Sequence, residues 1–121
     1  MENCIFCKII DKKIPSKVLY EDEVVMVYLD INPMHTGHTL IIPKTHYKDL
    51  DDIEEKTLNH IMKIAKKIKL LLEEKLSADG VQLIQNNGNI QEVKHYHLHL
   101  IPNYEEEKEL DLDKVYEILT K

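Results

Sequence analysis

The sequence predicts a single α+β domain: a mainly antiparallel sheet of about five strands, one long helix and a short helix near each end of the chain. A chain of 121 residues with 43% hydrophobic residues is long enough for one domain with one core. Apolar residues recur at helical spacing through one long segment, and five short apolar runs are bounded by turn formers or proline. We therefore assign residues 1–121 to one domain.

The first half of the chain is expected to supply a helix and three strands. The helix is predicted over residues 3–11, with Asn3 as its N-cap. Residues 21–23 are predicted to form the turn of a hairpin, and Pro43 to end the third strand. The three strands are rich in β-branched or aromatic residues and cover residues 18–20, 24–29 and 38–42.

The second half of the chain contains the strongest helical signal, which predicts a helix near residues 53–76. Its periodic apolar residues are Leu58, Ile61, Ile64, Ala65, Ile68, Leu71, Leu72 and Leu76. Residues 86–89 read as a turn. The remaining expected elements are strands at residues 81–84 and 93–101, the latter ended by Pro102, and a short helix at about residues 111–119.

The charge balance and the distribution of apolar residues exclude several broad function classes. The net charge of −6 argues against general nucleic-acid binding, which needs a basic surface. No apolar run approaches the roughly 20 residues that span a bilayer, and the N-terminus lacks a signal-peptide pattern. We therefore expect a cytoplasmic protein that binds neither nucleic acid nor membrane, while a small anionic ligand stays compatible with the charge.

Three of the seven histidines alternate with other residues within five positions, at His95, His97 and His99. Alternate residues of a strand share one face, so the three imidazoles are expected on one side and Tyr96 and Leu98 on the other. A dry core would leave ring nitrogens unpaired. The histidine face is therefore predicted to meet solvent, metal or ligand, and a merely solvated strand face is the plainer alternative.

Imidazole suits attack on phosphorus near neutral pH. It is a nucleophile and a proton carrier, and a phosphoramidate intermediate divides one difficult displacement into two steps. Neighbouring imidazoles can donate hydrogen bonds to the phosphate oxygens as charge shifts.

The run from His95 to Ile101 resembles the signature of the histidine-triad (HIT) family, and further segments resemble its zinc-containing Hint-type branch. The resemblance covers residues 3–102 and implies a HIT-like fold, a nucleotide ligand and a homodimer joined through the long helix and a strand edge. Besides the triad, the matching segments are residues 3–10, 14–16, 29–33, 37–46 and 86–88.

The resemblance also implies residue roles. His97 corresponds to the nucleophile, His99 to a residue that hydrogen-bonds the phosphate, and His38 to a further histidine near it. We expect a backbone carbonyl of the same strand to hold the second nitrogen of His97. Asp30 corresponds to the carboxylate that accepts from the ribose hydroxyls. The other implied nucleotide contacts are Ile31, Phe6 and Ile10 around the base, for which core packing is the alternative, and Asn86 and Gln91 near the phosphate.

Cys4 and Cys7 have the spacing of two zinc ligands. The resemblance implies His46 and His95 as the other two, which would make a closed, structural Zn²⁺ site. A redox pair is the alternative, but it needs a thioredoxin-like strand before the motif, and there is no room for one before Cys4.

Two segments depart from the family pattern. The loop from Gly88 to Gln91 is short and lacks the glycine that relatives often have there, so we expect a tighter loop near the phosphate. After Tyr104 the chain continues with three glutamates, and an arginine often found in relatives is missing. These departures bear on substrate choice more than on chemistry.

The sequence thus predicts a hydrolase that cleaves at the α-phosphate of a nucleotide through a nucleotidyl-histidine intermediate, acting on purine nucleoside 5′-phosphoramidates. Two alternatives stay open. One is a dinucleoside polyphosphate hydrolase of the Fhit branch, which lacks the zinc cysteines. The other is a non-catalytic nucleotide-binding interaction protein that has kept the fold.

Overall fold

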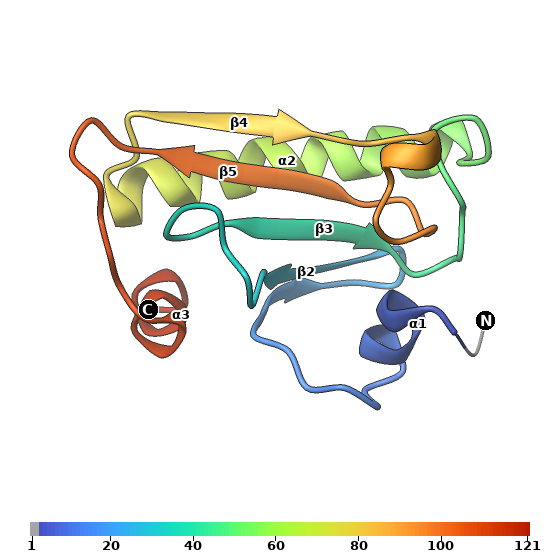
Figure 1. The fold of residues 1–121 in the computed structure, drawn as a ribbon, viewed down its shortest axis with the longest axis horizontal. Coiled ribbons are helices and arrows are strands. Elements are labelled where there is room, and N and C mark those ends of the chain that lie inside the picture. Colours follow the sequence, from blue (N-terminus) through green and yellow to red (C-terminus); the bar gives the residue numbers. More distant parts are fainter. Residues whose placement is uncertain (1–2) are drawn as a thin grey trace.

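The computed structural model describes residues 3–121, and it confirms the α+β class with a five-stranded antiparallel sheet and one long helix. The strand order is β1-β2-β3-β5-β4 (Figure 1). None of the helices in this part of the chain is long and apolar enough to cross a membrane. The elements are α1 (Ile5–Ile10), β1 (Val18–Glu21), β2 (Val25–Leu29), β3 (Thr39–Pro43), α2 (Glu55–Leu76), β4 (Gly80–Ile84), the 3-10 turn η1 (Gly88–Ile90), β5 (Leu98–Asn103) and α3 (Leu112–Leu119).

The two faces of the sheet pack against different helices. Alternation along β2 sends Val25, Val27 and Leu29 into a core shared with α2 and α3. Met26 and Tyr28 point the other way, into a smaller core closed by α1. Figure 1 shows α2 running along the sheet, with the shorter α1 near the ends of β2 and β3. Because α1 has only six residues, it leaves the ends of β4 and β5 on its own side of the sheet uncovered by a helix.

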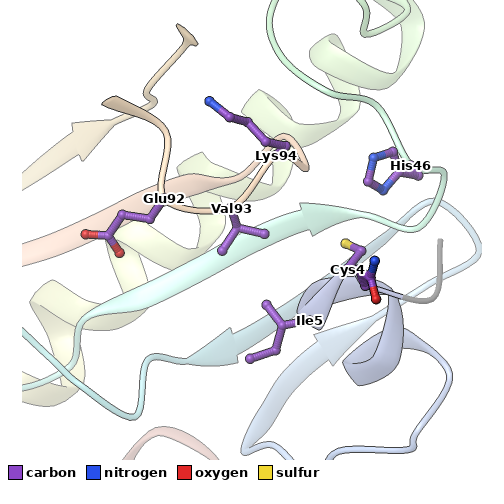
Figure 2. A pocket seen from close by; sticks show the side chains of 7 residues that line it. Cys4, Ile5, His46, Glu92, Val93 and Lys94 are labelled. Carbon is purple, nitrogen blue, oxygen red and sulfur yellow. The ribbon is translucent and has the colours of Figure 1, made fainter. Parts of the chain in front are cut away.

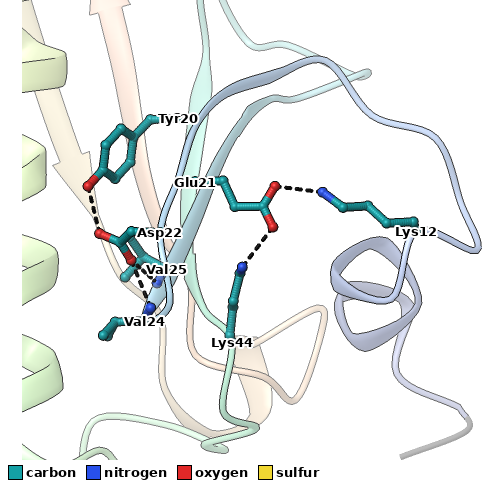
Figure 3. A network of polar contacts seen from close by, with 7 residues as sticks. All are labelled: Lys12, Tyr20, Glu21, Asp22, Val24, Val25 and Lys44. Atoms are coloured by element: carbon teal, nitrogen blue, oxygen red, sulfur yellow. Dashed lines mark hydrogen bonds and ion pairs between the residues drawn. The ribbon is translucent and has the colours of Figure 1, made fainter.

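The β1–β2 turn is fixed by one carboxylate, that of Asp22 (Figure 3). It accepts hydrogen bonds from the backbone N–H of Val24 and Val25, each at 2.8 Å, and from the hydroxyl of Tyr20 at 2.7 Å. His60 of α2 lies 2.7 Å from the same group. Burial opposes ionisation, but these bonds outweigh it and hold the pKa of Asp22 well below its usual range. Asp22 therefore ties the hairpin to the long helix.

The histidine run differs from the prediction, because β5 begins at Leu98 and not at residue 93. Leu98 pairs with Ile41 of β3, so continuing the ladder would place Tyr96 opposite Pro43, which has no N–H to donate. The N–H of Tyr96 instead donates to the carbonyl of Tyr47 at 2.7 Å. The segment before Leu98 therefore leaves the sheet, and only His99 of the three histidines lies in a strand.

Two other boundaries were predicted wrongly. Pro102 lies inside β5, paired with Val81 of β4, because β3 pairs only with residues 98–100 and no ladder bond is lost at the proline. The first helix begins at Ile5, and its N-cap is Cys4 and not Asn3: the Cys4 thiol accepts from the N–H of Cys7 at 3.3 Å. The cysteine at the start of the helix thus orders its first turn.

Candidate active site

The histidine run divides between two clusters on the α1 side of the sheet. His95 has 0% exposure and lies with the two cysteines, whereas His97 and His99 line an open cavity. Phe6 of α1 separates the two, with its ring centroid 5.8 Å from that of His95 and 4.8 Å from that of His97. The same five-residue segment therefore serves two sites.

The first cluster has the geometry of a metal centre formed by Cys4, Cys7, His46 and His95, and these residues could hold a metal ion. The Nδ1 atom of His95 lies 3.4 Å and 3.6 Å from the two sulfurs and 3.1 Å from Nδ1 of His46. The Sγ of Cys7 lies 3.3 Å from the Nδ1 of His46. Four ligands at zinc bond lengths stand roughly 3.3–3.8 Å apart at the corners of a tetrahedron. The donor atoms therefore fit a closed Cys₂His₂ site.

The far nitrogen of His95 supports this fit. Its Nε2 lies 2.8 Å from the carbonyl oxygen of Pro43, which can only accept, so Nε2 carries the ring proton. Nδ1 then has a free lone pair directed at the cluster. Metal-bound histidines commonly donate their other N–H in this way. A thioredoxin-like redox pair would need a strand before Cys4. Within the described residues the first strand is β1, which begins at Val18, so the redox alternative is not supported.

His97 is held in one orientation by a hydrogen bond to one of its ring nitrogens. Its Nδ1 donates to the backbone carbonyl of His95 at 2.7 Å, so the acceptor is a backbone carbonyl as expected, but it belongs to the segment before β5 and not to a strand. The lone pair therefore lies on Nε2. Burial lowers the pKa of His97, and the hydrogen bond to His95 only partly opposes this effect. The ring is thus kept neutral, which is the state in which an imidazole can act as a nucleophile.

His38 and His99 form a hydrogen-bond chain whose direction is fixed by a backbone amide. The N–H of Met34 donates to Nδ1 of His38 at 3.1 Å, so the proton of His38 lies on Nε2. That nitrogen lies 2.9 Å from Nδ1 of His99, which must accept. The remaining proton of His99 is then on its Nε2. Burial, followed by the charges of His97 and His38, lowers the pKa of His99 to about 4, so it is a neutral donor.

Asp30, His38 and His99 also lie close enough together to resemble a metal site. The Asp30 carboxylate lies 3.6 Å from Nε2 of His38 and accepts from the N–H of Asn32 at 2.9 Å. A metal would need the lone pair of His38 Nε2, but the Met34 amide places the proton there. This cluster is therefore a hydrogen-bond relay.

The loop between β2 and β3 that carries Asp30 and positions His38 is anchored on both sides. Gly37 has φ +89°, and a Cβ at this position would lie 2.6 Å from a side-chain atom of Leu76. The hydroxyl of Tyr104 donates to the carbonyl of Thr36 at 2.7 Å. The segment after β5 thus braces the loop from the side opposite the cavity.

Comparison with known proteins identifies this architecture. The HIT domain family model matches residues 11–106. The chain belongs to the HIT family.

The relatives of this HIT protein include characterised and uncharacterised chains. An uncharacterised HIT-like protein of Methanocaldococcus jannaschii is 47% identical, covering 93% of this chain and 95% of that protein. An adenosine 5′-monophosphoramidase of Saccharomyces cerevisiae is 43% identical, covering 93% of this chain and 75% of the yeast protein. A zinc-bound histidine-triad protein of Mycobacterium smegmatis superposes with a TM-score of 0.91 at 34% identity, covering 98% of this chain and 91% of that one.

A cavity of about 350 Å³ brings together five of the nine residues predicted to act on the nucleotide or to bind it. The predicted residues on its wall are Asp30, His38, Asn86, His97 and His99. Sequence analysis missed Asn32, Met34, Ile84, Glu92 and Ile101, which also line it. Strand alternation could have found two of these, since Ile84 pairs with His99 across β4 and β5, and Ile101 follows His99 on the same face.

Four residues predicted to contact the nucleotide lie outside this cavity wall. Phe6 is buried and Ile10 half-buried in the small core under α1. Ile31 is 70% exposed and lines a neighbouring cavity of about 220 Å³ that also includes Asp30. Gln91 is buried, and its Nε2 donates to the carbonyl of Lys48 at 2.5 Å. Gln91 thus braces the loop before the triad against the segment that follows His46.

A larger, open cavity of about 980 Å³ adjoins the metal cluster (Figure 2). Cys4, Ile5 and His46 form one side of it, and Glu92, Val93 and Lys94 form the other. Glu92 lines this cavity as well as the one that contains His97. It therefore stands at the boundary between them.

Proposed function

We propose that this HIT protein is a nucleotide hydrolase that cleaves at the α-phosphate of purine nucleoside 5′-phosphoramidates through a nucleotidyl-histidine intermediate. The observation that carries the proposal is the pair of fixed tautomers beside one cavity. His97 offers a lone pair on Nε2, and His99 offers an N–H. A nucleophile next to a hydrogen-bond donor is what phosphoryl transfer requires. The yeast phosphoramidase named above supports the choice of substrate.

The proposed reaction consists of two successive displacements at the α-phosphorus. The lone pair of His97 Nε2 forms a bond to the α-phosphorus while the bond from phosphorus to the leaving nitrogen breaks. That nitrogen keeps the bonding pair, takes a proton from water and departs as an amine. Water then attacks the same phosphorus, the bond to His97 breaks, and the water's proton leaves with solvent. His99 donates to the phosphate oxygens in both transition states.

The nucleoside is proposed to lie toward Asp30. A carboxylate can accept from both ribose hydroxyls, and its backbone bond from Asn32 fixes its orientation. Ile31 is exposed beside it and offers an apolar surface to a base. Asn86 also lines the cavity and is proposed to contact the phosphate, while Phe6 and Ile10 support the wall from the core under α1. Gln91 is proposed to act through the loop that it braces.

The deciding experiment measures AMP release from adenosine 5′-phosphoramidate. We expect turnover by the wild-type protein and a loss of about 1,000-fold or more in His97→Gly. His35→Gly is the matched control, because it makes the same substitution at a histidine that lies outside both clusters. Turnover by His97→Gly at the wild-type rate would refute the nucleophile. Preference for a dinucleoside polyphosphate, or nucleotide binding without turnover on either substrate, would refute the proposed activity.

We further propose that the metal is zinc and that it is structural. Cys4, Cys7, His46 and His95 leave no open coordination position for substrate, and the ion would join α1 to the segment before β5. The ion would therefore have a structural role: it would hold His95 in place. The carbonyl of His95, which orients His97, would be held with it. About one zinc per purified chain is expected from metal analysis, and free, reactive thiols without metal would contradict the site.

We also propose a homodimer joined through β4 and α2. β4 is an edge strand, and Leu83 on it is 40% exposed. Met62 and Leu70 of α2 are 44% and 55% exposed, so apolar surface continues onto the helix. Sedimentation at the monomer mass at micromolar concentration would contradict this assembly. The cytoplasmic location stays a prediction of the sequence.

A further inference from the structure

The cavity that contains His97 has an unusual charge for a phosphate site. Two carboxylates, Asp30 and Glu92, line it, and within the described part of the chain no lysine does. All 16 basic residues of the protein are lysines, so no arginine can reach the cavity either. Polyphosphate substrates are usually held by lysine, arginine or a metal ion. The neutral histidines supply hydrogen bonds to one phosphate group but no positive charge for a second.

The two carboxylates are not equivalent. Asp30 accepts from the N–H of Asn32 and lies 3.6 Å from His38, so the loop that carries it already engages its charge. Glu92 is exposed, and within residues 3–121 no lysine forms an ion pair with it. The ammonium of the nearby Lys94 donates instead to the carbonyl of Gly88. The charge of Glu92 is therefore available to a ligand.

The position of Glu92 places that charge between the cavity that contains His97 and the larger cavity. Figure 2 shows its carboxylate directed away from Cys4, His46 and the ammonium of Lys94. Because Glu92 lines both cavities, a group extending from the α-phosphorus toward the larger cavity passes it.

We propose that Glu92 selects the leaving group: it favours phosphoramidates whose departing amine carries an additional positive charge, and it disfavours anionic and polyphosphate leaving groups. This inference rests on the proposed function and specifies its substrate class. An ammonium on the leaving group is attracted to the carboxylate before and during cleavage of the phosphorus–nitrogen bond. A polyphosphate leaving group brings negative charge to the same place and is repelled.

The test compares three adenosine 5′-phosphoramidates with leaving amines of similar length. The amines are butylamine, 1,4-diaminobutane linked through one nitrogen, and 4-aminobutanoate, whose free ends are neutral, positive and negative. We expect the wild-type kcat/KM to fall in the order positive, neutral, negative, with about a tenfold difference between the first and last. In Glu92→Gln this ratio should fall to near one. Raising the salt concentration should shrink the wild-type ratio, because the charges are exposed.

Glu106→Gln is the matched control, since it changes the net charge equally at an exposed glutamate outside the site. It should keep the wild-type order of the three substrates. An equal ratio in wild type and Glu92→Gln, or the same loss of ratio in Glu106→Gln, would overturn the inference while leaving the phosphoramidase proposal intact. Absence of turnover by the wild-type protein on all three substrates would instead overturn the proposed function, on which this inference rests.

Discussion

The two histidine clusters use similar side chains for opposite purposes. His95 and His38 are both buried, and each directs one ring nitrogen into a group of potential metal ligands. The other nitrogen of His95 donates to the carbonyl of Pro43, which leaves a lone pair facing the cluster. The other nitrogen of His38 accepts from the N–H of Met34, which leaves a proton facing the cluster. One backbone group thus decides whether an imidazole can bind a metal or must donate a hydrogen bond.

The largest effect that this comparison predicts is on the metal cluster. His46→Ala should abolish metal binding and lower the free energy of unfolding by about 3 kcal/mol or more, because the closed site links α1, the segment after β3 and the triad. Metal analysis and chemical denaturation measure the two effects. His38→Ala is the paired variant, and it should keep the full metal content. Loss of metal from His38→Ala but not from His46→Ala would reverse the assignment of the two clusters.

The next effect concerns the relay of the second cluster. His38→Ala should lower kcat by about 10- to 100-fold, because nothing then keeps the proton of His99 on its Nε2. The KM for adenosine 5′-phosphoramidate should change less, since His38 acts through His99. His38→Gln, whose amide N–H can still donate to His99, should recover part of the activity. A loss confined to KM would mean that His38 only binds substrate.

A smaller effect is expected on stability below neutral pH. Burial, followed by the charges of His97 and His38, lowers the pKa of His99 to about 4, while Asp30 acts in the opposite direction. Unfolding frees the ring to bind a proton below about pH 6.5, so the unfolded state takes up more protons than the folded state between pH 6.5 and 4. His99 therefore makes stability fall as the pH drops through this window.

The measurement is the melting temperature of wild type and His99→Gln between pH 4 and pH 7.5. The variant should lose less stability on acidification, and the difference between the two proteins should become independent of pH above about pH 7. The metal cluster is the same in both proteins, so its own acid sensitivity contributes equally. An identical pH dependence in the two proteins would show that His99 titrates normally in the folded state.

The sequence predicted the fold and most of the phosphate-facing residues because these depend on local patterns. The helical repeat located α2, and motif spacing brought His97, His99, His38 and Asp30 to one cavity. Prediction from the sequence failed where the structure depends on contacts between distant segments. To predict that the triad segment leaves the sheet, one must know that the register of β3 and β5 would set Tyr96 opposite Pro43. No local sequence pattern shows that register.

Glu92 and the tautomers escaped prediction for a related reason. No sequence motif marks Glu92, because its importance depends on the cavity around His97, which distant segments form and which no lysine lines within the described residues. The proton of His38 is set by the amide of Met34, four residues earlier, and only the loop geometry shows that contact. The chemical identity of a site residue was therefore predictable, whereas its protonation state was not.

The smallest predicted effect concerns a buried polar group without a hydrogen-bond partner on the α1 side of the sheet. Tyr28 is 4% exposed, and its hydroxyl has no hydrogen-bond partner within residues 3–121. Burial, followed by the negative charge of Asp30, raises its pKa, so the hydroxyl stays protonated at neutral pH. Tyr28→Phe should raise the free energy of unfolding by about 1 kcal/mol, because it removes an unpaired buried group and keeps the ring against Phe6. Urea denaturation measures the change, and destabilisation instead would mean that the hydroxyl is paired in solution.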